Sequence, residues 1–227
     1  MNDRQQGQDG GDLQRIRERL ATGVITDALT RMGLDGWMDQ VLPMRPDSVA
    51  VGPAYTVRCA PRRGADGLGK TLYEIIRECQ RGDVLVIEAI GTGTSVFGGN
   101  IARTGDVHGL ASIVTDGHCR DWGQSSKLRM GVFCRGPTVR LPNDLEIVAQ
   151  NVPITCSGAQ VNPGDLIVAD IDGVCVVPSS KMRDLLIEVE DILEIEDEIA
   201  KVIDRAGPIA DIHALLKRKK ARKTPAS

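Results

Sequence analysis

Apolar residues follow two patterns along the chain, one typical of helices and one typical of buried strands. Residues 13–20 carry apolar side chains at helical spacing and predict a first helix. A second helix is expected over residues 26–32, because Thr26 or Asp27 can cap its start and Gly33 can end it. Short apolar runs bounded by glycine or aspartate predict buried strands instead.

The same patterns predict elements as far as residue 216. Strands are expected at residues 49–60 (with a break at Gly52-Pro53), 83–88, 111–115, 131–134, 152–155, 166–170 and 174–177. Helices are expected at residues 71–80, 101–107, 121–130 (capped by Asp121), 179–205 (capped by Ser179 or Ser180) and 210–216. Helices alternate with strands in the first half, and strands cluster in the second half. The fold class is therefore α/β with a β-rich portion.

Length and charge narrow the class of protein. A chain of 227 residues predicts one large domain, and its 3% aromatic content predicts a core of Val, Ile, Leu and Ala. A net charge of −3 argues against a protein that coats nucleic acid. There is no apolar run of 18 residues, and residues 1–12 lack the apolar core of a signal peptide. These features favour a cytoplasmic protein.

The two ends of the chain are expected to differ from its body. Residues 1–12 are polar and are predicted to be disordered, and residues 13–216 are predicted to form a single domain. Residues 217–227 begin with a basic run that could bind nucleic acid or an acidic partner. A solvated, disordered tail is the favoured interpretation.

The six cysteines are scattered without a CxxC pair, and the three histidines lack the spacing of metal ligands. Buried free thiols are therefore expected, rather than disulfides or a zinc site. His118 lies beside Cys119 in the sequence, but neighbours on an extended segment point to opposite faces. This arrangement does not favour a thiol nucleophile.

Residues 96–124 contain the strongest candidate for a site. Gly98 and Gly99 precede an expected helix, whose free N–H groups suit a carboxylate or phosphate. Arg120 and Asp121 follow the strand after that helix, where open α/β sheets tend to place ligands. The alternative is a simple glycine turn and a surface ion pair, with Asp121 only capping a helix.

A second candidate is the stretch from Gly64 to Thr71, which fits the phosphate-loop pattern G-x-x-x-x-G-K-[ST]. Lys70 and Thr71 would then contact phosphates and magnesium. The preceding strand alternates apolar and polar residues, however, whereas a phosphate-loop strand is continuously apolar. A chance match is favoured.

Several stretches together resemble one family. The central stretch has a helix headed by Gly98 and then Asp-Gly-x-x-Arg-Asp, which ends at Asp121. Residues 24–33, 81–87 and 162–174 fit the same family's N-terminal helix and its two glycine-aspartate strand entries. The chain resembles the RraA-like proteins, which include class II pyruvate aldolases acting on 4-hydroxy-4-methyl-2-oxoglutarate. The resemblance spans most of the chain and also accounts for residues 64–71 without a nucleotide.

This resemblance implies a fold, an assembly and a chemistry. The fold would be an α/β–β sandwich with mixed sheets and a long C-terminal helix, assembled as a homotrimer or as a hexamer with sites between subunits. Mg²⁺ or Mn²⁺ would be held near Asp121. The amides of Gly98, Gly99, Asn100 and Ile101, together with Arg120, would bind a 2-oxo acid whose cleavage gives a pyruvate enolate. Aldol cleavage and oxaloacetate decarboxylation share that enolate.

Two positions depart from the aldolase pattern. Gly99 and Gln124 stand where the aldolases carry acidic residues, and such groups orient the ligands of a metal. Glu194 or Glu196 of a neighbouring subunit could supply an acidic group, although a solvated helix face is the default for both. The metal-dependent lyase is favoured. The alternatives are a non-catalytic protein-binding regulator of ribonuclease activity and a nucleotide-binding protein that uses Lys70 and Thr71.

Overall fold

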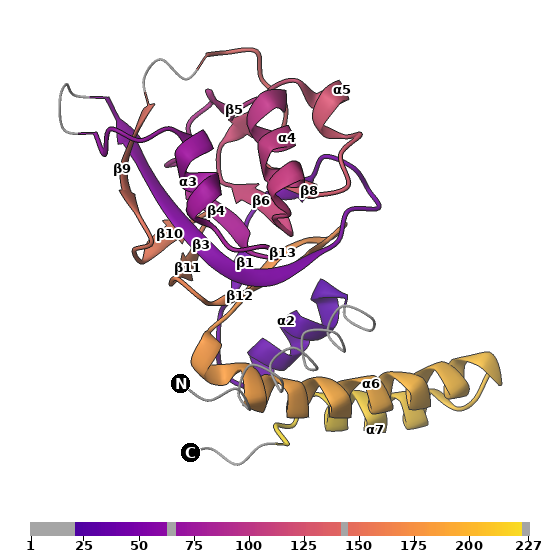
Figure 1. Ribbon diagram of the computed structural model, residues 1–227. Helices are drawn as coiled ribbons and strands as arrows, with labels where there is room; N and C mark the ends of the chain where they lie inside the picture. Colours follow the sequence, from indigo (N-terminus) through magenta and orange to yellow (C-terminus); the bar gives the residue numbers. More distant parts are fainter. Residues whose placement is uncertain (1–20, 63–66, 142–144, 224–227) are drawn as a thin grey trace.

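The structure is a computed structural model, and it describes residues 21–62, 67–141 and 145–223. The helix expected at residues 13–20 and the disordered segment expected at residues 1–12 lie outside the described residues. One mixed sheet of nine strands forms the centre, with helices around it (Figure 1). The α/β class is confirmed.

The helices in the described ranges are α2 (Thr22–Arg31), α3 (Leu72–Glu78), α4 (Gly99–His108), α5 (Trp122–Ser125), α6 (Met182–Asp204) and α7 (Ile209–Lys219), with a 3₁₀ turn at Ser179–Lys181. The strands of the main sheet are β1 (Trp37–Met38), β2 (Leu42–Pro43), β3 (Ala50–Pro61), β4 (Val84–Glu88), β6 (Ser112–Thr115), β8 (Gly131–Cys134), β9 (Leu145–Gln150), β12 (Leu166–Asp170) and β13 (Gly173–Val177). Two small sheets pair β5 (Ser95–Phe97) with β7 (His118–Cys119), and β10 (Ile154–Cys156) with β11 (Ala159–Val161).

The strand order of the main sheet is β1-β13-β12-β3-β4-β6-β8-β2, with β9 paired to β3. Strands β3, β4, β6 and β8 run parallel, and α3, α4 and α5 lie in the three connections between them. Strands β12 and β13 form an antiparallel hairpin beside β3. The central stretch, residues 96–124, leaves β5, passes through α4, β6 and β7, and ends in α5.

Three apolar clusters hold these layers together. One packs α3 and α4 on the parallel strands and includes Ile75, Ala102 and Ile113. A second, around Phe133, joins the opposite face of the sheet to β10 and β11. A third packs α2 and α6 against β12 and β13, and Leu185 is fully buried in it. Burial of apolar surface in these clusters fixes both helix layers on the sheet.

The break expected at Gly52-Pro53 is absent, and β3 runs without interruption from residue 50 to residue 61. Pro53 lies opposite Leu166, and the next residue, Ala54, donates its N–H to the Asp165 carbonyl. The ladder therefore resumes directly after the proline. Gly52 is needed because a Cβ there would collide with the Gly82 carbonyl oxygen.

The disordered tail expected from residue 217 is wrong for residues 217–223. Helix α7 continues to Lys219 and packs beside α6 (Figure 1). The Lys219 ammonium reaches Asp27 and Glu196, and Arg218 makes a two-point contact with Glu198. The basic run is ordered because α6 presents carboxylates along its length. Residues 224–227 lie outside the described ranges.

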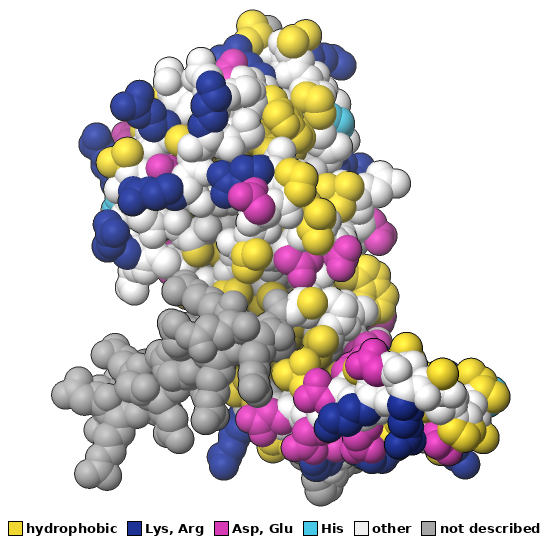
Figure 2. All heavy atoms as spheres, turned by 90° about the vertical axis from the view of Figure 1, so that its right-hand side faces the viewer, with side chains coloured by type: hydrophobic (Ala, Val, Ile, Leu, Met, Phe, Trp, Pro, Cys, Tyr) yellow, Lys and Arg dark blue, Asp and Glu magenta, His cyan; other side chains and the backbone are white. Residues whose placement is uncertain are grey.

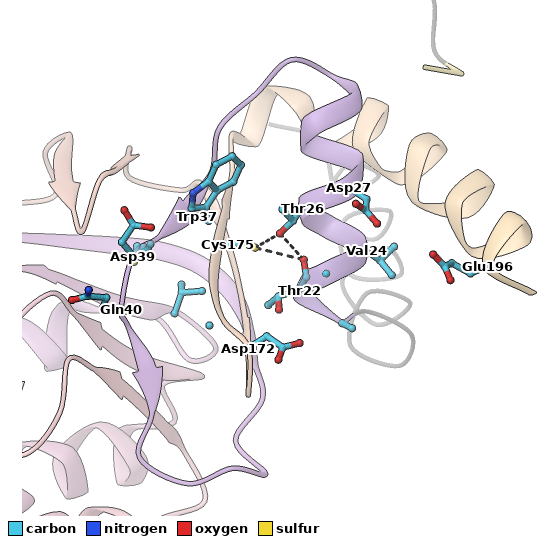
Figure 3. A pocket seen from close by; sticks show the side chains of 15 residues that line it. Thr22, Val24, Thr26, Asp27, Trp37, Asp39, Gln40, Asp172, Cys175 and Glu196 are labelled. Carbon is cyan, nitrogen blue, oxygen red and sulfur yellow. Dashed lines mark hydrogen bonds between the residues drawn. The ribbon is translucent and has the colours of Figure 1, made fainter. Parts of the chain in front are cut away.

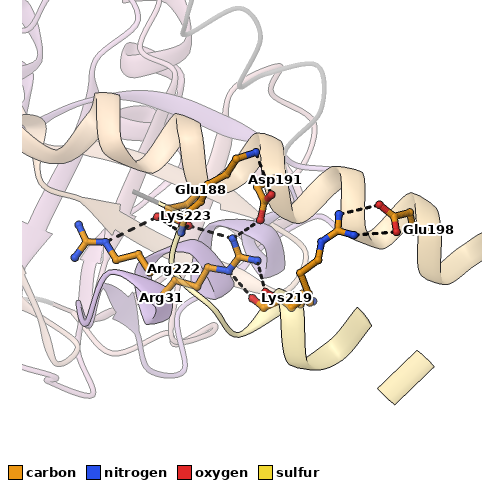
Figure 4. A network of polar contacts seen from close by, with 8 residues as sticks. Arg31, Glu188, Asp191, Glu198, Lys219, Arg222 and Lys223 are labelled. Atoms are coloured by element: carbon orange, nitrogen blue, oxygen red, sulfur yellow. Dashed lines mark hydrogen bonds and ion pairs between the residues drawn. The ribbon is translucent and has the colours of Figure 1, made fainter. Parts of the chain in front are cut away.

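A buried ion pair lies under this C-terminal segment (Figure 4). Arg31, at the end of α2, contacts Glu188 at 3.1 Å and Asp191 at 2.9 Å, and its side chain is only 2% exposed. Its guanidinium also donates to the Lys219 carbonyl, while the Lys223 amide donates to the Glu188 carboxylate. These contacts join α2, α6 and residues 217–223. We call this network of contacts the C-terminal clasp.

Candidate functional site

The predicted site forms where two short parallel strands end side by side. Strand β5 leads into Gly98, and β7 leads into Arg120. The Arg120 amide donates to the Phe97 carbonyl at 3.1 Å, which holds the two strand ends together. Residues more than twenty positions apart in the sequence thus meet at the N-terminus of α4. The β5–β7 pairing was not predicted, because strands of two or three residues give almost no periodic signal.

Asp121 is joined to the glycine loop by a hydrogen bond. The Gly99 amide donates to Asp121 Oδ2 at 2.9 Å, and Arg120 Nε lies 3.8 Å from the same oxygen. A side chain on Gly98 would collide with the Asp121 carboxylate and the Arg120 side chain. The close approach of these two side chains therefore requires glycine at position 98.

The role predicted for Asp121 as the cap of a long helix is wrong. Its backbone is left-handed, with φ 58°, and its side chain makes no capping bond to α5. Helix α5 consequently covers only residues 122–125 rather than 121–130. The unusual backbone turns the carboxylate toward the N-terminus of α4, and left-handed aspartates of this kind often mark functional positions.

The four amides predicted to bind an anion are not equivalent. The Gly99 amide is taken by Asp121, and the Ile101 amide donates to the Gly98 carbonyl at 3.1 Å. The amides of Gly98 and Asn100 have no acceptor within the ranges that the structure describes. These two N–H groups, at the positive end of the α4 dipole, are the ones open to a carboxylate.

The residues around Asp121 are compatible with a hard divalent cation whose remaining ligands are water and substrate. In the described part of the chain, no three His, Cys, Asp or Glu side chains gather into a metal cage. Asp121 is 42% exposed and supplies one carboxylate. Mg²⁺ commonly takes one or two carboxylates and completes its shell with water and substrate. Asp121 alone is compatible with such a site.

Lys70 and Thr71 of the phosphate-loop pattern have structural roles. The Thr71 hydroxyl and amide form a capping box with Glu74 at the start of α3. The Lys70 ammonium binds the Glu78 carboxylate at 2.6 Å. Both groups that would contact a nucleotide are therefore occupied. Residues 63–66, which include Gly64, lie outside the described ranges.

The cysteines are buried thiols, as predicted. All six are free and buried, and burial raises the pKa of Cys59 and of Cys79 to about 12. Burial also raises the pKa of Cys119, while His118 Nδ1 donates to the Thr92 carbonyl on another segment. His118 and Cys119 do not form a nucleophile and base pair.

A cavity of about 700 Å³ lies elsewhere, between α2, β1, β13 and α6 (Figure 3). Gly98, Gly99, Asn100, Ile101, Arg120 and Asp121 are not among its lining residues, whereas Glu196, the candidate acidic group from a neighbouring subunit, is. The Thr22 hydroxyl is bound to Asp170, and the Asp27 and Glu196 carboxylates on its wall are bound to Lys219. These three side chains have partners within the protein, whereas among the described residues no hydrogen bond or ion pair is recorded for the side chains of Asp39, Gln40 and Asp172, which also line the cavity.

The described helices include none that combines the length and the apolar character needed to span a bilayer.

Comparison with known proteins identifies the family. A sequence profile of RraA-like proteins, described as Aldolase/RraA, matches residues 22–176, which is more than half of the chain. The chain belongs to the RraA-like family. The matched range contains the glycine loop, Arg120 and Asp121, and the predicted resemblance is confirmed.

The names of the relatives include aldolases and ribonuclease inhibitors. A protein from Halalkalibacterium halodurans, named "Putative 4-hydroxy-4-methyl-2-oxoglutarate aldolase", is 36% identical over 168 residues, which cover 74% of this chain and 77% of that one. The crystal structure of Streptomyces coelicolor RraAS2, titled an unusual member of the RNase ES inhibitor RraA protein family, is 30% identical. It superposes with a TM-score of 0.76 over 86% of this chain and 98% of that one.

A further RraA-like fold is an uncharacterized protein from Pseudomonas syringae, with a TM-score of 0.77 and 25% identity over 88% of this chain and 96% of that one. The fold predicted from the resemblance, a mixed sheet with a long C-terminal helix, is therefore confirmed. The family contains proteins named as aldolases and proteins named as ribonuclease inhibitors, so membership alone does not assign an activity.

Proposed function

We propose that this protein is a divalent-metal-dependent lyase that cleaves a carbon–carbon bond of a 2-oxo acid, of the 4-hydroxy-4-methyl-2-oxoglutarate aldolase or oxaloacetate decarboxylase type. The observation that carries the proposal is the hydrogen bond from the Gly99 amide to Asp121, with Arg120 beside it. This bond brings a carboxylate, a guanidinium and a helix N-terminus to one half-exposed place. Two RraA-like relatives are named "Putative 4-hydroxy-4-methyl-2-oxoglutarate aldolase", which supports the aldolase part of the proposal.

Each group has a task that suits its chemistry. The amides of Gly98 and Asn100 would bind the substrate carboxylate at the start of α4. Arg120 would hold the oxygen on which negative charge develops as the bond breaks, since a guanidinium offers several donors in a fixed plane. Asp121 would hold Mg²⁺ or Mn²⁺, which when bound would supply Lewis-acid stabilisation of that charge.

The test measures pyruvate release from 4-hydroxy-4-methyl-2-oxoglutarate and from oxaloacetate, with and without Mg²⁺ or Mn²⁺. Removing the Arg120 guanidinium (Arg120→Ala) is expected to lower kcat/KM on the order of 100-fold, the usual effect of losing one donor to a developing negative charge. Asp121→Asn keeps a residue that tolerates the left-handed backbone but removes the charge, so metal-dependent turnover should be lost. Arg183→Ala, on the exposed side of α6, is the matched control.

Turnover that survives both Arg120→Ala and Asp121→Asn would place the site elsewhere. A correctly folded protein that releases no pyruvate with either metal would favour the second candidate, a non-catalytic protein-binding regulator of ribonuclease activity. One observation favours that candidate: among the described residues, Asp121 is the single carboxylate recorded in contact with the glycine loop. The similarity to Streptomyces coelicolor RraAS2 is compatible with it.

A further inference from the structure

A groove of about 460 Å³ lies between α3 and α4, beside the site already described. Two of its walls carry arginines, Arg77 on α3 and Arg103 on α4. The full lining is Tyr73, Arg77, Asn100, Arg103, Thr104, Val107 and His108. This set contains two guanidinium groups and no carboxylate, although the whole chain has a net charge of −3.

The carboxylates that could neutralise the groove are bound elsewhere. Glu74 accepts from the Thr71 amide and hydroxyl, and Glu78 accepts from Lys70 and Gln150. Asp106, on α4, accepts from the Met130 amide at 2.8 Å. Within the described ranges, neither Arg77 nor Arg103 has a recorded ion pair or hydrogen bond. The groove therefore presents positive charge without an internal partner.

The face of the molecule drawn in Figure 2 shows the same separation of charge on a larger scale. Asp and Glu side chains gather toward the α6–α7 end, whereas Lys and Arg side chains predominate on the lobe that contains α3, α4 and α5. An anion that approaches this lobe is attracted to it before contact.

The groove and the proposed site share one residue, Asn100. Asn100 is the second residue of α4, next to the Gly99 amide that binds Asp121. Asn100, Arg103, Thr104 and Val107 share one face of the helix, so the groove runs along α4 away from its N-terminus. Arg103 lies about 4.5 Å farther along the helix axis than Asn100, at a rise of 1.5 Å per residue. A ligand a few bonds long spans that separation.

We propose that this α3–α4 groove binds a second acidic group of the substrate, remote from the 2-oxo acid end, with Arg77 and Arg103 as its ligands. The inference rests on the proposed function for the position of the 2-oxo acid at Gly98, Asn100 and Arg120. It assigns Arg77 and Arg103 as the residues that recognise the second carboxylate of such a 2-oxo acid. Tyr73 and Val107, which are both exposed in the groove, would contact the apolar part of the chain between the two acidic groups.

The experiment compares two ligands that differ only in the remote carboxylate. Binding of 2-oxoglutarate and of 2-oxopentanoate, which has the same carbon chain, is measured by calorimetry in the presence of Mg²⁺. The protein variants are the double substitution Arg77→Gln with Arg103→Gln, and Arg183→Gln as the control. All three arginines are exposed, so the fold should be retained, and unfolding temperatures check this.

We expect the unmodified protein and Arg183→Gln to bind 2-oxoglutarate about tenfold or more tightly than 2-oxopentanoate, because a charge-assisted hydrogen bond contributes at least that factor. The double variant should lose this preference and bind 2-oxopentanoate unchanged. With 4-hydroxy-4-methyl-2-oxoglutarate as substrate, the double variant should show a raised KM and an unchanged kcat.

A preference for 2-oxoglutarate that persists in the double variant, equal affinity for the two ligands in the unmodified protein, or no binding of either ligand would overturn the groove proposal. The lyase proposal is judged separately, by pyruvate release. A protein that cleaves no 2-oxo acid but loses its preference in the double variant would refute the lyase and retain the groove. If the protein releases pyruvate and neither its turnover nor its KM changes in the double variant, the groove proposal is refuted and the lyase proposal is retained.

Discussion

The side chain of Gln124 occupies the space into which a side chain at position 99 would extend. A Cβ atom on Gly99 would lie 2.6 Å from Gln124 Oε1 and 3.2 Å from the Asp121 Cβ. The two departures from the aldolase pattern are therefore in contact with each other. Glycine at position 99 and glutamine at position 124 form one packed arrangement beside Asp121.

This contact makes Gln124→Glu the simplest way to restore an acidic group. Glutamate has nearly the shape of glutamine, so it fits the same space and adds a second carboxylate near Asp121. Mg²⁺ should then bind about tenfold more tightly, on the scale at which groups around a metal change affinity. Metal titration by calorimetry measures the change. An affinity equal to that of the unmodified protein would mean that the cation does not bind beside position 124.

Gly98→Ala tests the shape of the site without removing any functional group. The new methyl group would displace the Asp121 carboxylate and the Arg120 side chain, which it cannot approach. Displacements of about 1 Å can cost on the order of 100-fold in rate, so kcat/KM should fall by that order. The Gly98 backbone is extended, and the fold should persist.

The control for Gly98→Ala is Gly123→Ala in the neighbouring helix α5. No atom lies within 4 Å of where its Cβ would be. Turnover should therefore stay close to that of the unmodified protein. An equal loss in both variants would indicate a general effect on the loop rather than displacement of Arg120 and Asp121.

Arg31→Ala tests the C-terminal clasp. It removes the 3.1 Å contact between Arg31 and the Glu188 carboxylate, which is 0% exposed, and leaves the Arg222 guanidinium 3.9 Å away; weakening the compensation of a buried charge is destabilising. The free energy of unfolding should fall by about 3 kcal/mol, measured by urea denaturation. Arg218→Ala removes an ion pair on the surface and should change the midpoint little. Similar midpoints for the two variants would contradict a buried role for Arg31.

The loss of folding stability at acidic pH should depend on Asp191. Burial raises the pKa of this carboxyl, but hydrogen bonds from Arg31 and Lys223 outweigh burial and hold the pKa below its ordinary value. A lowered pKa in the folded state gives stability that is present above the unfolded-state pKa and is lost as the pH falls through the folded-state pKa. Asp191→Asn should therefore be less stable at pH 7, and the difference should close below about pH 4. Denaturant midpoints from pH 7 to pH 3 measure it; a difference that stays constant over this range would exclude the linkage.

The sequence predicted those helices and strands whose apolar pattern is long or is bounded by clear turn residues. Strands β8 and β12 have the expected limits. Helix α4, which was located from its glycines, begins two residues before the expected range and extends one residue beyond it. The proximity of Gly98, Arg120 and Asp121 was also predicted, from the helix and return strand between them, although the β5–β7 pairing that brings these residues together was not.

What the sequence did not predict depends on contacts between distant residues. The left-handed backbone of Asp121 is stabilised by the Gly99 amide, twenty-two positions away, and no local pattern shows such a bond. The order of residues 217–223 depends on carboxylates of α6 and on Arg31 of α2. From the sequence alone, a basic run is interpreted as a solvated tail, because the sequence does not show that it contacts an acidic helix face.

The C-terminal clasp also has a consequence for biosynthesis. Residues 218–223 lie against Arg31, Glu188 and Asp191, so the first helix of the described chain is fastened by residues that are translated almost two hundred positions later. While the ribosome still holds residue 223, Glu188 and Arg31 lack part of their native surroundings. The sheet and α4 can pack during synthesis, but α2 reaches its final environment only after release of this segment.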